Sequence, residues 1–471
     1  VEYDPLFLAL TRPIMVAGVT YDFMVINAMA TTLAFLATGN LLMFLIGAPI
    51  HAIGYVLSLK DPRIFSLLSV ALTKHGNCHA LNKKLWGCTT YTPTQANARG
   101  KMAIEKTTHG QEALNDKPVS QFIPYSAHID EHTISTREGY LLQTIELEGL
   151  DFETLDQEDL NQLKNARNNL WKTLADSSIS ISYHIIRQEI TDYPDNENLE
   201  GFAKDLDEAW EAKFENKRLF VNKHYLTVIR RPRKGSAGLV AEIQKLFVKA
   251  IDKDATREEL RCGLKALDDV AQPILTTLKR YAPRRLSVHE ADNGAYASEA
   301  LEFLYTLINQ DQQNVALPSS DLANYLPAKR FFFGKDALVI RGAERDDITF
   351  GAMIGVKEYS PKTFPGMLDH LLRTPQEMVV TQHFSFVERP KALAALKTVV
   401  RQMDMAEDAA LSLQEDLLEA MDDAESRRIV FGEHQLSILV KGKSTKGLDE
   451  GVSEIMGQMR DLGLIATRED M

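Results

Sequence analysis

The chain has 471 residues, of which 45% are hydrophobic and 25% are charged. This length and composition predict two or three packed domains and exclude a collagenous, disulfide-framed or broadly disordered protein. Asp and Glu (65) outnumber Lys and Arg (53), and the net charge of −12 argues against wrapping nucleic acid over the whole surface. Three cysteines are too few to staple a secreted fold, which indicates a reducing compartment: Cys78, Cys88 and Cys262.

One long segment is uncharged. Residues 23–59 contain no Asp, Glu, Lys or Arg, and Gly39-Asn40 divides them into two apolar legs. Since one membrane crossing takes about 20 apolar residues, the segment predicts a transmembrane helical hairpin rather than one helix. A cleaved signal peptide does not fit, because Asp22 precedes the segment and the apolar run is too long. The basic residues after the second leg predict that both ends lie in the cytoplasm: Lys60, Arg63, Lys74, Lys83 and Lys84.

Two polar side chains interrupt the apolar legs. Asn27 and His51 lie at nearly equal distances from the Gly39-Asn40 tip on opposite legs, so we predict a hydrogen bond between them across the hairpin. Pro49 would leave a nearby carbonyl without its helical donor. A proton or solute transporter centred on this pair is a weaker alternative, because two helices offer too little wall for a pathway unless several copies assemble.

The motifs around the hairpin occur in a recognisable order. Pro5-Leu6-Phe7 and Leu10-Thr11-Arg12-Pro13 precede it, and Asp61-Pro62-Arg63-Ile64-Phe65 follows it. In this order they resemble the small inner-membrane subunit of bacterial type IV secretion systems. The resemblance implies a membrane-anchoring domain over residues 1–91. Residues 92–119 are polar and weakly patterned, as is typical of a linker, so we predict a fusion of two formerly separate units.

Strands and helices alternate from residue 120 onward. The pattern predicts a hairpin over residues 133–148, a helix over 155–174, a strand over 179–188, a helix over 202–216 and a strand over 224–230. A similar order recurs later in the chain. It comprises a hairpin over residues 331–341, a strand over 349–358, a helix over 364–372, a strand over 378–387, a long helix over 391–421 and a strand over 434–441.

Local sequence echoes support a repeat. Residues 182–187 echo residues 382–387, and residues 224–228 echo residues 434–438. The predicted fold class is therefore α/β (α+β), in which the transmembrane hairpin precedes duplicated ferredoxin-like split βαβ units over residues 120–235 and 327–471. Residues 237–281 and 297–308 have helical periodicity and predict an inserted helical bundle within residues 236–326.

The α/β part resembles a second family. The residues that carry the resemblance are 147–154, the strand that ends in Ile186-Arg187, Lys357-Glu358-Tyr359 followed by Leu371-Leu372, Gln382-His383-Phe384, and Gly463-Leu464 with Arg468-Glu469-Asp470. They look like the amino-terminal domain of the conjugal-transfer ATPases, the CagE/TrbE/VirB family, over roughly residues 118–471. This resemblance implies that a RecA-like motor domain would follow, with ATP and Mg²⁺ as its cofactors and six copies as the usual unit.

No catalytic, cofactor-binding or metal-binding residue is predicted in this chain. The only Gly-Lys-Ser, Gly442-Lys443-Ser444, lacks the first glycine of the Walker A spacing, because Ser437 stands there. Residues 434–441 continue as a strand, which turns alternate N–H groups away from any one phosphate. A zinc site is a minor alternative, since its candidate donors match no strong zinc signature: His75, Cys78, His79 and Cys88.

Two functions follow. The resemblances imply the membrane-anchoring and partner-binding part of a type IV secretion ATPase at the bacterial inner membrane, with most of the chain on the cytoplasmic face. Its expected partners are other secretion-system subunits, inner-membrane lipid and further copies of itself, hexameric through the motor, with no direct nucleic-acid binding. The alternative is a non-catalytic structural subunit of an inner-membrane secretion complex. Without Walker A and B motifs this chain should not hydrolyse ATP alone, and a motor encoded beyond Met471 would favour the first function.

Overall fold

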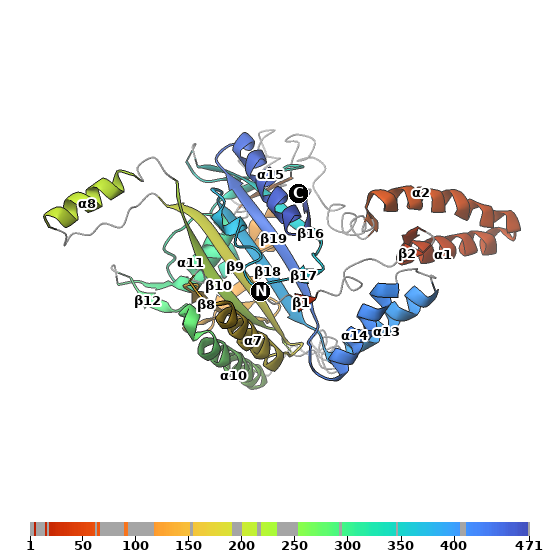
Figure 1. Ribbon diagram of the computed structural model, residues 1–471, viewed down its shortest axis with the longest axis horizontal. Coiled ribbons are helices and arrows are strands. Elements are labelled where there is room, and N and C mark those ends of the chain that lie inside the picture. Colours follow the sequence, from red (N-terminus) through yellow and green to blue (C-terminus); the bar gives the residue numbers. More distant parts are fainter. Residues whose placement is uncertain are drawn as a thin grey trace.

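A fourteen-stranded sheet organises the α/β part of the chain (Figure 1). The computed structural model describes residues 4–5, 15–16, 18–61, 64–65, 89–92, 117–150, 154–190, 200–213, 218–232, 253–291, 294–344, 347–405 and 411–469. From one edge to the other, the strands are β5 (Lys117–Pro118), β4 (Thr89–Thr92), β14 (Arg330–Phe333), β15 (Leu338–Arg341), β16 (Ile348–Glu358), β19 (Gly432–Gly442), β18 (Met378–Phe386), β9 (Ile179–Ile190), β10 (Leu219–Arg230), β8 (Leu141–Leu147), β7 (Thr133–Thr136) and β6 (Tyr125–His128). Two short strands lie beside this path, because β11 (Arg284–Arg285) pairs with β8 and β20 (Ile465–Arg468) pairs with β16.

Helices cover both faces of the sheet. Successive side chains of a strand point to opposite faces, so Ile185 and Ile186 of β9 enter different cores. The core that contains Ile181 is covered by α7 (Gln157–Thr173) and α10 (Lys253–Thr277), and the core of Ile185 is covered by α15 (Thr445–Asp461) on the same face. The core of Ile186 lies on the opposite face and is covered by α11 (Glu299–Asn309).

The two halves of the sheet meet at β9 and β18. These strands pair antiparallel from Met378 opposite Arg187 to Ser385 opposite Ser180. The pairing pattern around β8 is repeated around β16, since β8 pairs with β7, β10 and β11 while β16 pairs with β15, β19 and β20. Short elements complete the body, namely η3 (Val119–Gln121), η4 (Lys279–Tyr281), η5 (Leu371–Arg373), α12 (Leu322–Tyr325) and the paired strands β12 (Val288–Glu290) and β13 (Tyr296–Ser298).

Most of the predicted strands and several helices form within a few residues of their expected bounds, and the mixed α/β class is confirmed. The helix predicted over residues 364–372 is wrong, because turns and η5 occupy it. Pro365 disfavours a helical conformation at the residue before it, and Gly366 has a φ of 78°, which a right-handed helix does not allow.

The long helix predicted over residues 391–421 is also wrong, because two helices occupy this segment. They are α13 (Arg389–Met405) and α14 (Leu411–Glu425), and residues 406–410 lie outside the described part. Leu396 and Met403 of α13 are buried against Leu417 of α14. Folding the segment back on itself therefore covers apolar faces that one straight helix would leave in water.

The helices predicted as an inserted bundle pack on the sheet instead. Leu267 and Ile274 of α10 are buried with Ile181 on one face, whereas Leu301 and Phe303 of α11 are buried with Ile186 on the other face. Residues 237–252 of the expected bundle lie outside the described part. In the described residues, the apolar stripes of α10 and α11 thus serve as cover for the two sheet faces rather than for each other.

Candidate functional site

The uncharged segment folds as a helical hairpin. It comprises α1 (Tyr21–Thr38), the 3₁₀ helix η2 (Leu41–Ile46) and α2 (Gly47–Lys60), with the turn at Gly39-Asn40 as predicted. Gly39 has a φ of 64°, which ends α1 in the left-handed conformation that glycine adopts without strain. The Asn40 side-chain oxygen accepts a hydrogen bond from the Leu42 backbone N–H at 3.0 Å and so caps η2.

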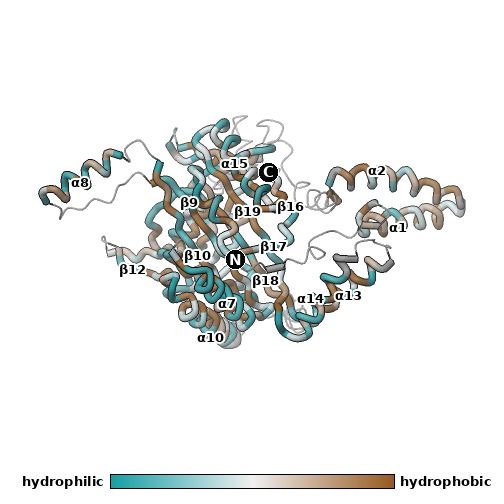
Figure 2. Tube along the Cα trace, viewed as in Figure 1, coloured by the Kyte–Doolittle hydropathy of each residue, from teal (hydrophilic) through white to brown (hydrophobic). Residues whose placement is uncertain are grey.

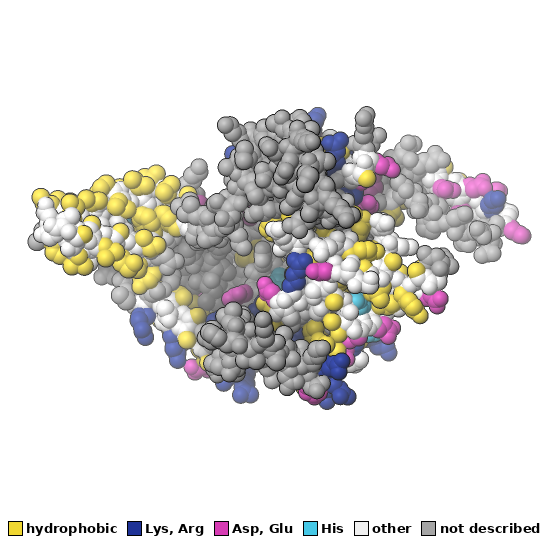
Figure 3. Space-filling view, turned by 180° about the vertical axis from the view of Figure 1, so that it is seen from behind, with side chains coloured by type: hydrophobic (Ala, Val, Ile, Leu, Met, Phe, Trp, Pro, Cys, Tyr) yellow, Lys and Arg dark blue, Asp and Glu magenta, His cyan; other side chains and the backbone are white. Residues whose placement is uncertain are grey.

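The outer surface of the hairpin is apolar. Figure 2 shows α1 and α2 coloured mainly as hydrophobic, and Figure 3 shows hydrophobic side chains gathered over the same projection. The large hydrophobic side chains that are more than half exposed include Ile26, Met29, Leu33, Leu36, Leu42, Leu45, Ile53, Val56 and Leu59. A continuous apolar surface of this kind marks a contact with lipid or protein rather than with water.

One helix of the hairpin meets the length and composition needed to cross a membrane. Leu42–Leu59 has a mean hydropathy of 1.9, and only 11% of this window is buried inside the structure. The other leg, Phe23–Thr38, is a shorter apolar helix. At about 1.5 Å per residue, the longer window reaches close to the ~30 Å hydrocarbon thickness of a bilayer.

Small residues let the two legs approach closely. An added Cβ at Gly54 would overlap the Phe23 ring, and one at Gly47 would lie 2.9 Å from Cγ2 of Thr31. The Asn27 amide nitrogen donates a hydrogen bond to the Gly47 carbonyl at 3.1 Å, across the seam. Asn27 is only 7% exposed, and its Oδ1 is buried without a hydrogen-bond partner among the described residues.

The geometry bears on one member of the predicted pair, Asn27 and His51. Asn27 does bond across the hairpin, but its amide donates to a backbone carbonyl of α2. His51 lies on α2, one helical turn beyond Gly47, and is half-buried. A contact between Asn27 and His51 therefore stays a prediction.

Two contacts attach the hairpin segment to the α/β body. The Lys357 ammonium on β16 lies 2.9 Å from Oδ2 of Asp61, which follows α2, and both side chains are about three-quarters buried. Strand β1 (Asp4–Pro5) pairs with β17 (Lys362–Thr363) in the loop after β16. Within the segment itself, Phe23 at the base of α1 stacks on Phe65 at 4.3 Å between ring centroids. Asp61 and Lys357 belong to the two motif sets that carry the two resemblances, but no local sequence signal pairs them.

The Gly442-Lys443-Ser444 segment caps a helix. Ser444 is the N-cap of α15, and its Oγ accepts a hydrogen bond from the Gly447 N–H at 3.1 Å. Lys443 is 84% exposed and lies 3.2 Å from a carboxylate oxygen of Glu189. The two functional groups that a phosphate-binding loop would use are thus engaged in protein contacts.

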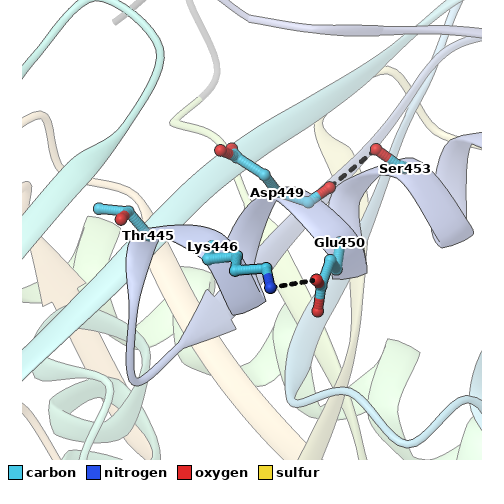
Figure 4. A pocket seen from close by; sticks show the side chains of 5 residues that line it. All are labelled: Thr445, Lys446, Asp449, Glu450 and Ser453. Atoms are coloured by element: carbon cyan, nitrogen blue, oxygen red, sulfur yellow. Dashed lines mark hydrogen bonds and ion pairs between the residues drawn. The ribbon is translucent and has the colours of Figure 1, made fainter.

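The first turns of α15 carry a shallow hollow (Figure 4). Its lining includes Asp449 and Glu450, and Lys446 pairs with Glu450 at 3.8 Å. Carboxylates on the wall repel an anionic ligand, so this hollow does not suit a nucleotide. The candidate zinc donors His75, Cys78, His79 and Cys88 lie outside the described residues, and within the described ones no group of three or more His, Cys, Asp or Glu could hold a metal ion.

Comparisons with known proteins decide the family. Residues 2–87 match the family "Type IV secretory pathway, VirB3-like protein", and residues 132–237 match "Type IV secretion system ATPase VirB4/TrbE, N-terminal domain". Residues 284–471 match the "CagE, TrbE, VirB family, component of type IV transporter system". The chain is a VirB3-like segment followed by VirB4/TrbE-type domains. Both predicted resemblances are confirmed.

Curated relatives agree with these domains. The type IV secretion system protein virB4 of Bartonella henselae is 33% identical over 350 residues, which are 74% of this chain and 44% of that protein. The virB4 protein of Brucella suis is 29% identical over 370 residues, or 77% of this chain and 44% of the relative. PtlC of Bordetella pertussis is 27% identical over 368 residues, or 77% and 43%. The chain therefore spans less than half the length of these VirB4-type relatives.

Proposed function

We propose that this VirB3-VirB4 chain is the membrane-anchoring and partner-binding part of a type IV secretion ATPase. The observation that carries the proposal is the apolar hairpin α1–η2–α2, which projects from the sheet with its large hydrophobic side chains exposed (Figure 1). Burial in lipid would remove this surface from water. The order of the matched families, with the VirB3-like segment before the VirB4/TrbE domains, is consistent with an anchor joined to the front of an ATPase.

The hairpin would sit in the bacterial inner membrane with both ends on the cytoplasmic side. The basic residues after α2 favour this orientation, and the α/β body would then lie at the cytoplasmic face. The ion pair between Asp61 and Lys357 and the pairing of β1 with β17 would hold the body against the membrane surface. Lipid and the other inner-membrane subunits of the secretion system are the proposed partners.

We further propose that the α/β body is a duplicated ferredoxin-like split βαβ unit. In the first half, β11, β8, β10 and β9 lie side by side in that order, and in the second half β20, β16, β19 and β18 do the same. Helix α10 precedes β11 as α15 precedes β20. His184 opposite Thr381 has its counterpart in His383 opposite Ser182, as a two-fold axis through the pair Tyr183 and Gln382 would require.

ATP hydrolysis would belong to the rest of the full-length protein. The matched family names an ATPase, and the relatives extend well beyond the matched region. ATP and Mg²⁺ would bind a motor domain, and hexamer formation through that motor would place several anchors around one translocation site. The alternative of a purely structural subunit predicts no nucleotide hydrolysis by the native polypeptide.

Membrane extraction tests the anchor. Replacing Ile53 with Asp puts a charge on a 63%-exposed position of α2, and we expect the full chain to become extractable by alkaline carbonate, since a charge at the centre of a membrane helix costs about 3 kcal/mol. The matched control replaces Ile465, which is 50% exposed on β20, with Asp. An anchor role is refuted if the unsubstituted chain is extracted, or if both variants remain equally resistant.

ATPase assays separate the two functions. We expect the protein translated from the whole coding sequence to hydrolyse ATP and residues 1–471 alone to release no phosphate above background. A whole protein without hydrolysis in the presence of its membrane partners would favour the structural subunit, whatever the outcome of the carbonate extraction.

A further inference from the structure

Helix α8 (Phe202–Glu211) projects from the body at the end of the sheet opposite the membrane hairpin (Figure 1). It lies in the connection between β9 and β10, the two strands beside the centre of the sheet. In Figure 1 it stands clear of the other labelled helices. Its position makes it available to a partner that does not contact the membrane hairpin.

One face of α8 is apolar and exposed. Phe202, Leu206 and Trp210 recur at four-residue steps, so they lie along one side of the helix. Their exposed fractions are 80%, 56% and 50%. Large Phe and Trp side chains exposed to water cost free energy, and such side chains are typical anchors of protein interfaces.

The corresponding connection in the other half of the sheet shows how such a face can be covered. There α13 and α14 link β18 to β19, and the apolar side chains between them are buried: Leu396 is 2% exposed and Leu417 is 0% exposed. In the described part of the β9–β10 connection, α8 has no second helix of this kind. A helix from another molecule could take the place that α14 takes on α13.

The charges beside the apolar stripe identify the kind of helix that fits. Between residues 200 and 213 five acidic residues accompany two lysines. Lys204 pairs with Glu208 at 3.8 Å, and Lys213 lies 4.6 Å from the centre of the Trp210 ring. At 3.6 residues per turn, Asp205 and Asp207 flank the apolar stripe on its two sides, whereas Glu208 and Glu211 lie on the opposite side of the helix. The rim is therefore negative, which repels an anionic lipid surface and also a second copy of α8. A partner with Lys and Arg beside its apolar stripe would be attracted instead.

We propose that α8 binds an amphipathic helix of a partner protein through Phe202, Leu206 and Trp210, with basic residues of that partner facing Asp205 and Asp207, which flank this stripe. The proposal extends the partner-binding part of the proposed function, and α8 is remote from the anchor. A failed anchor and a failed α8 contact thus give different results, because the tests below leave α1 and α2 unchanged.

Peptide binding tests the chemistry of the contact. The probe is a dye-labelled helical peptide with a leucine stripe flanked by lysines, and its partner probe has the same stripe flanked by glutamates. We expect the full chain in detergent to bind the lysine peptide at least about tenfold more tightly, a difference of about 1.4 kcal/mol, by fluorescence anisotropy. The triple variant Phe202→Ser, Leu206→Ser, Trp210→Ser should lose at least about tenfold in affinity for the lysine peptide.

The matched control is Phe122→Ser, which removes a 60%-exposed aromatic ring from another part of the surface and should leave binding unchanged. Equal binding of the two peptides, or equal loss in the control and the triple variant, overturns the proposal. Circular dichroism of each variant checks that the chain still folds.

Crosslinking in assembled secretion complexes tests the native contact. A photo-crosslinking amino acid at position 206 should join the chain to a protein segment with an apolar helical stripe and a net positive charge, located by mass spectrometry. A crosslink to lipid, to α8 of a second copy, or to an acidic segment overturns the proposal.

Discussion

The Ser182 hydroxyl lies 2.8 Å from Nδ1 of His383, on facing positions of the two strands that join the halves of the sheet. The other ring nitrogen of His383 lies 3.0 Å from Oγ of Ser385, to which Arg231 donates a hydrogen bond at 2.7 Å. Burial lowers the pKa of His383, and the Arg231 charge lowers it further. A neutral imidazole therefore links the two halves, and protonation would place two positive charges at their junction.

The neighbouring His184 predicts that the chain loses stability in acid. Burial, with a smaller contribution from His383, lowers the pKa of His184 to about 4. The unfolded chain therefore binds a proton that the folded chain excludes between about pH 6.5 and pH 4, so the free energy of unfolding falls as the pH is lowered through this window. At about 1.4 kcal/mol per pKa unit, His184 alone accounts for a loss of up to about 3 kcal/mol.

Urea denaturation of the full chain in detergent at several pH values measures this effect. The variant His184→Phe keeps an aromatic ring against Phe303, 5.4 Å away between centroids in an edge-to-face contact, and should flatten the slope of stability against pH. Replacing the exposed His370 with Phe is the matched control and should leave the slope as it is. An unchanged slope in His184→Phe would show that His184 does not carry the acid sensitivity.

The N-cap of α15 gives a second prediction. The Ser444 hydroxyl satisfies the Gly447 N–H, so Ser444→Ala should lower the free energy of unfolding by about 1 kcal/mol and Ser444→Asp should restore most of it. Lys443→Ala should change stability by less than about 0.5 kcal/mol, because this side chain is 84% exposed. Chemical denaturation of the three variants provides the comparison. If Ser444→Ala were as stable as the parent, the cap would contribute nothing.

The alternating strands and the hairpin were predictable because their signals are local. Residues 179–188 alternate in polarity with β-branched side chains, and Gly39-Asn40 stands between two apolar legs. Helix α15 was not predicted, because Gly447, Gly451 and Gly457 lower its intrinsic propensity. Tertiary packing overrides this cost, since Leu448, Val452, Ile455 and Met459 are buried on the sheet.

Contacts between residues far apart in the chain could not be predicted from local sequence patterns. Nothing local pairs Asp61 with Lys357, which lie almost three hundred residues apart, or directs the Asn27 amide to the Gly47 carbonyl rather than to a side chain. Likewise, the exposure of Trp210 depends on how far α8 projects from the sheet. The sequence pattern identified the apolar surface of the hairpin, and the fold was needed to show how that surface connects to the body.

The seam of the hairpin gives a third prediction. Gly54→Leu should separate α1 from α2, because any side chain at this position overlaps the Phe23 ring. Asn27→Leu should have a milder effect, since one interhelical hydrogen bond in a membrane contributes about 0.6 kcal/mol. Spin labels on the two legs, in lipid nanodiscs, report their separation. A distance distribution in Gly54→Leu as narrow as in the parent would contradict close packing at this glycine, and Leu36→Ala, at a 70%-exposed position of α1, is the control.

The ion pair between Asp61 and Lys357 should hold the hairpin segment in place on the sheet. With the three native cysteines replaced by serine, Pro5→Cys and Lys362→Cys occupy paired positions of β1 and β17, so their rate of disulfide formation reports how often the hairpin segment is docked on the body. Asp61→Asn or Lys357→Met should each slow this rate by about two- to fivefold, as expected for a partly buried pair that contributes about 0.5–1 kcal/mol.

Two controls accompany these variants. Exchanging the charges, Asp61→Arg with Lys357→Glu, should recover most of the rate of disulfide formation. Lys446→Met, which removes an exposed pair on α15, should not change this rate. If the single and exchanged variants crosslink at the same rate as the parent, then pairing of β1 with β17 alone determines docking.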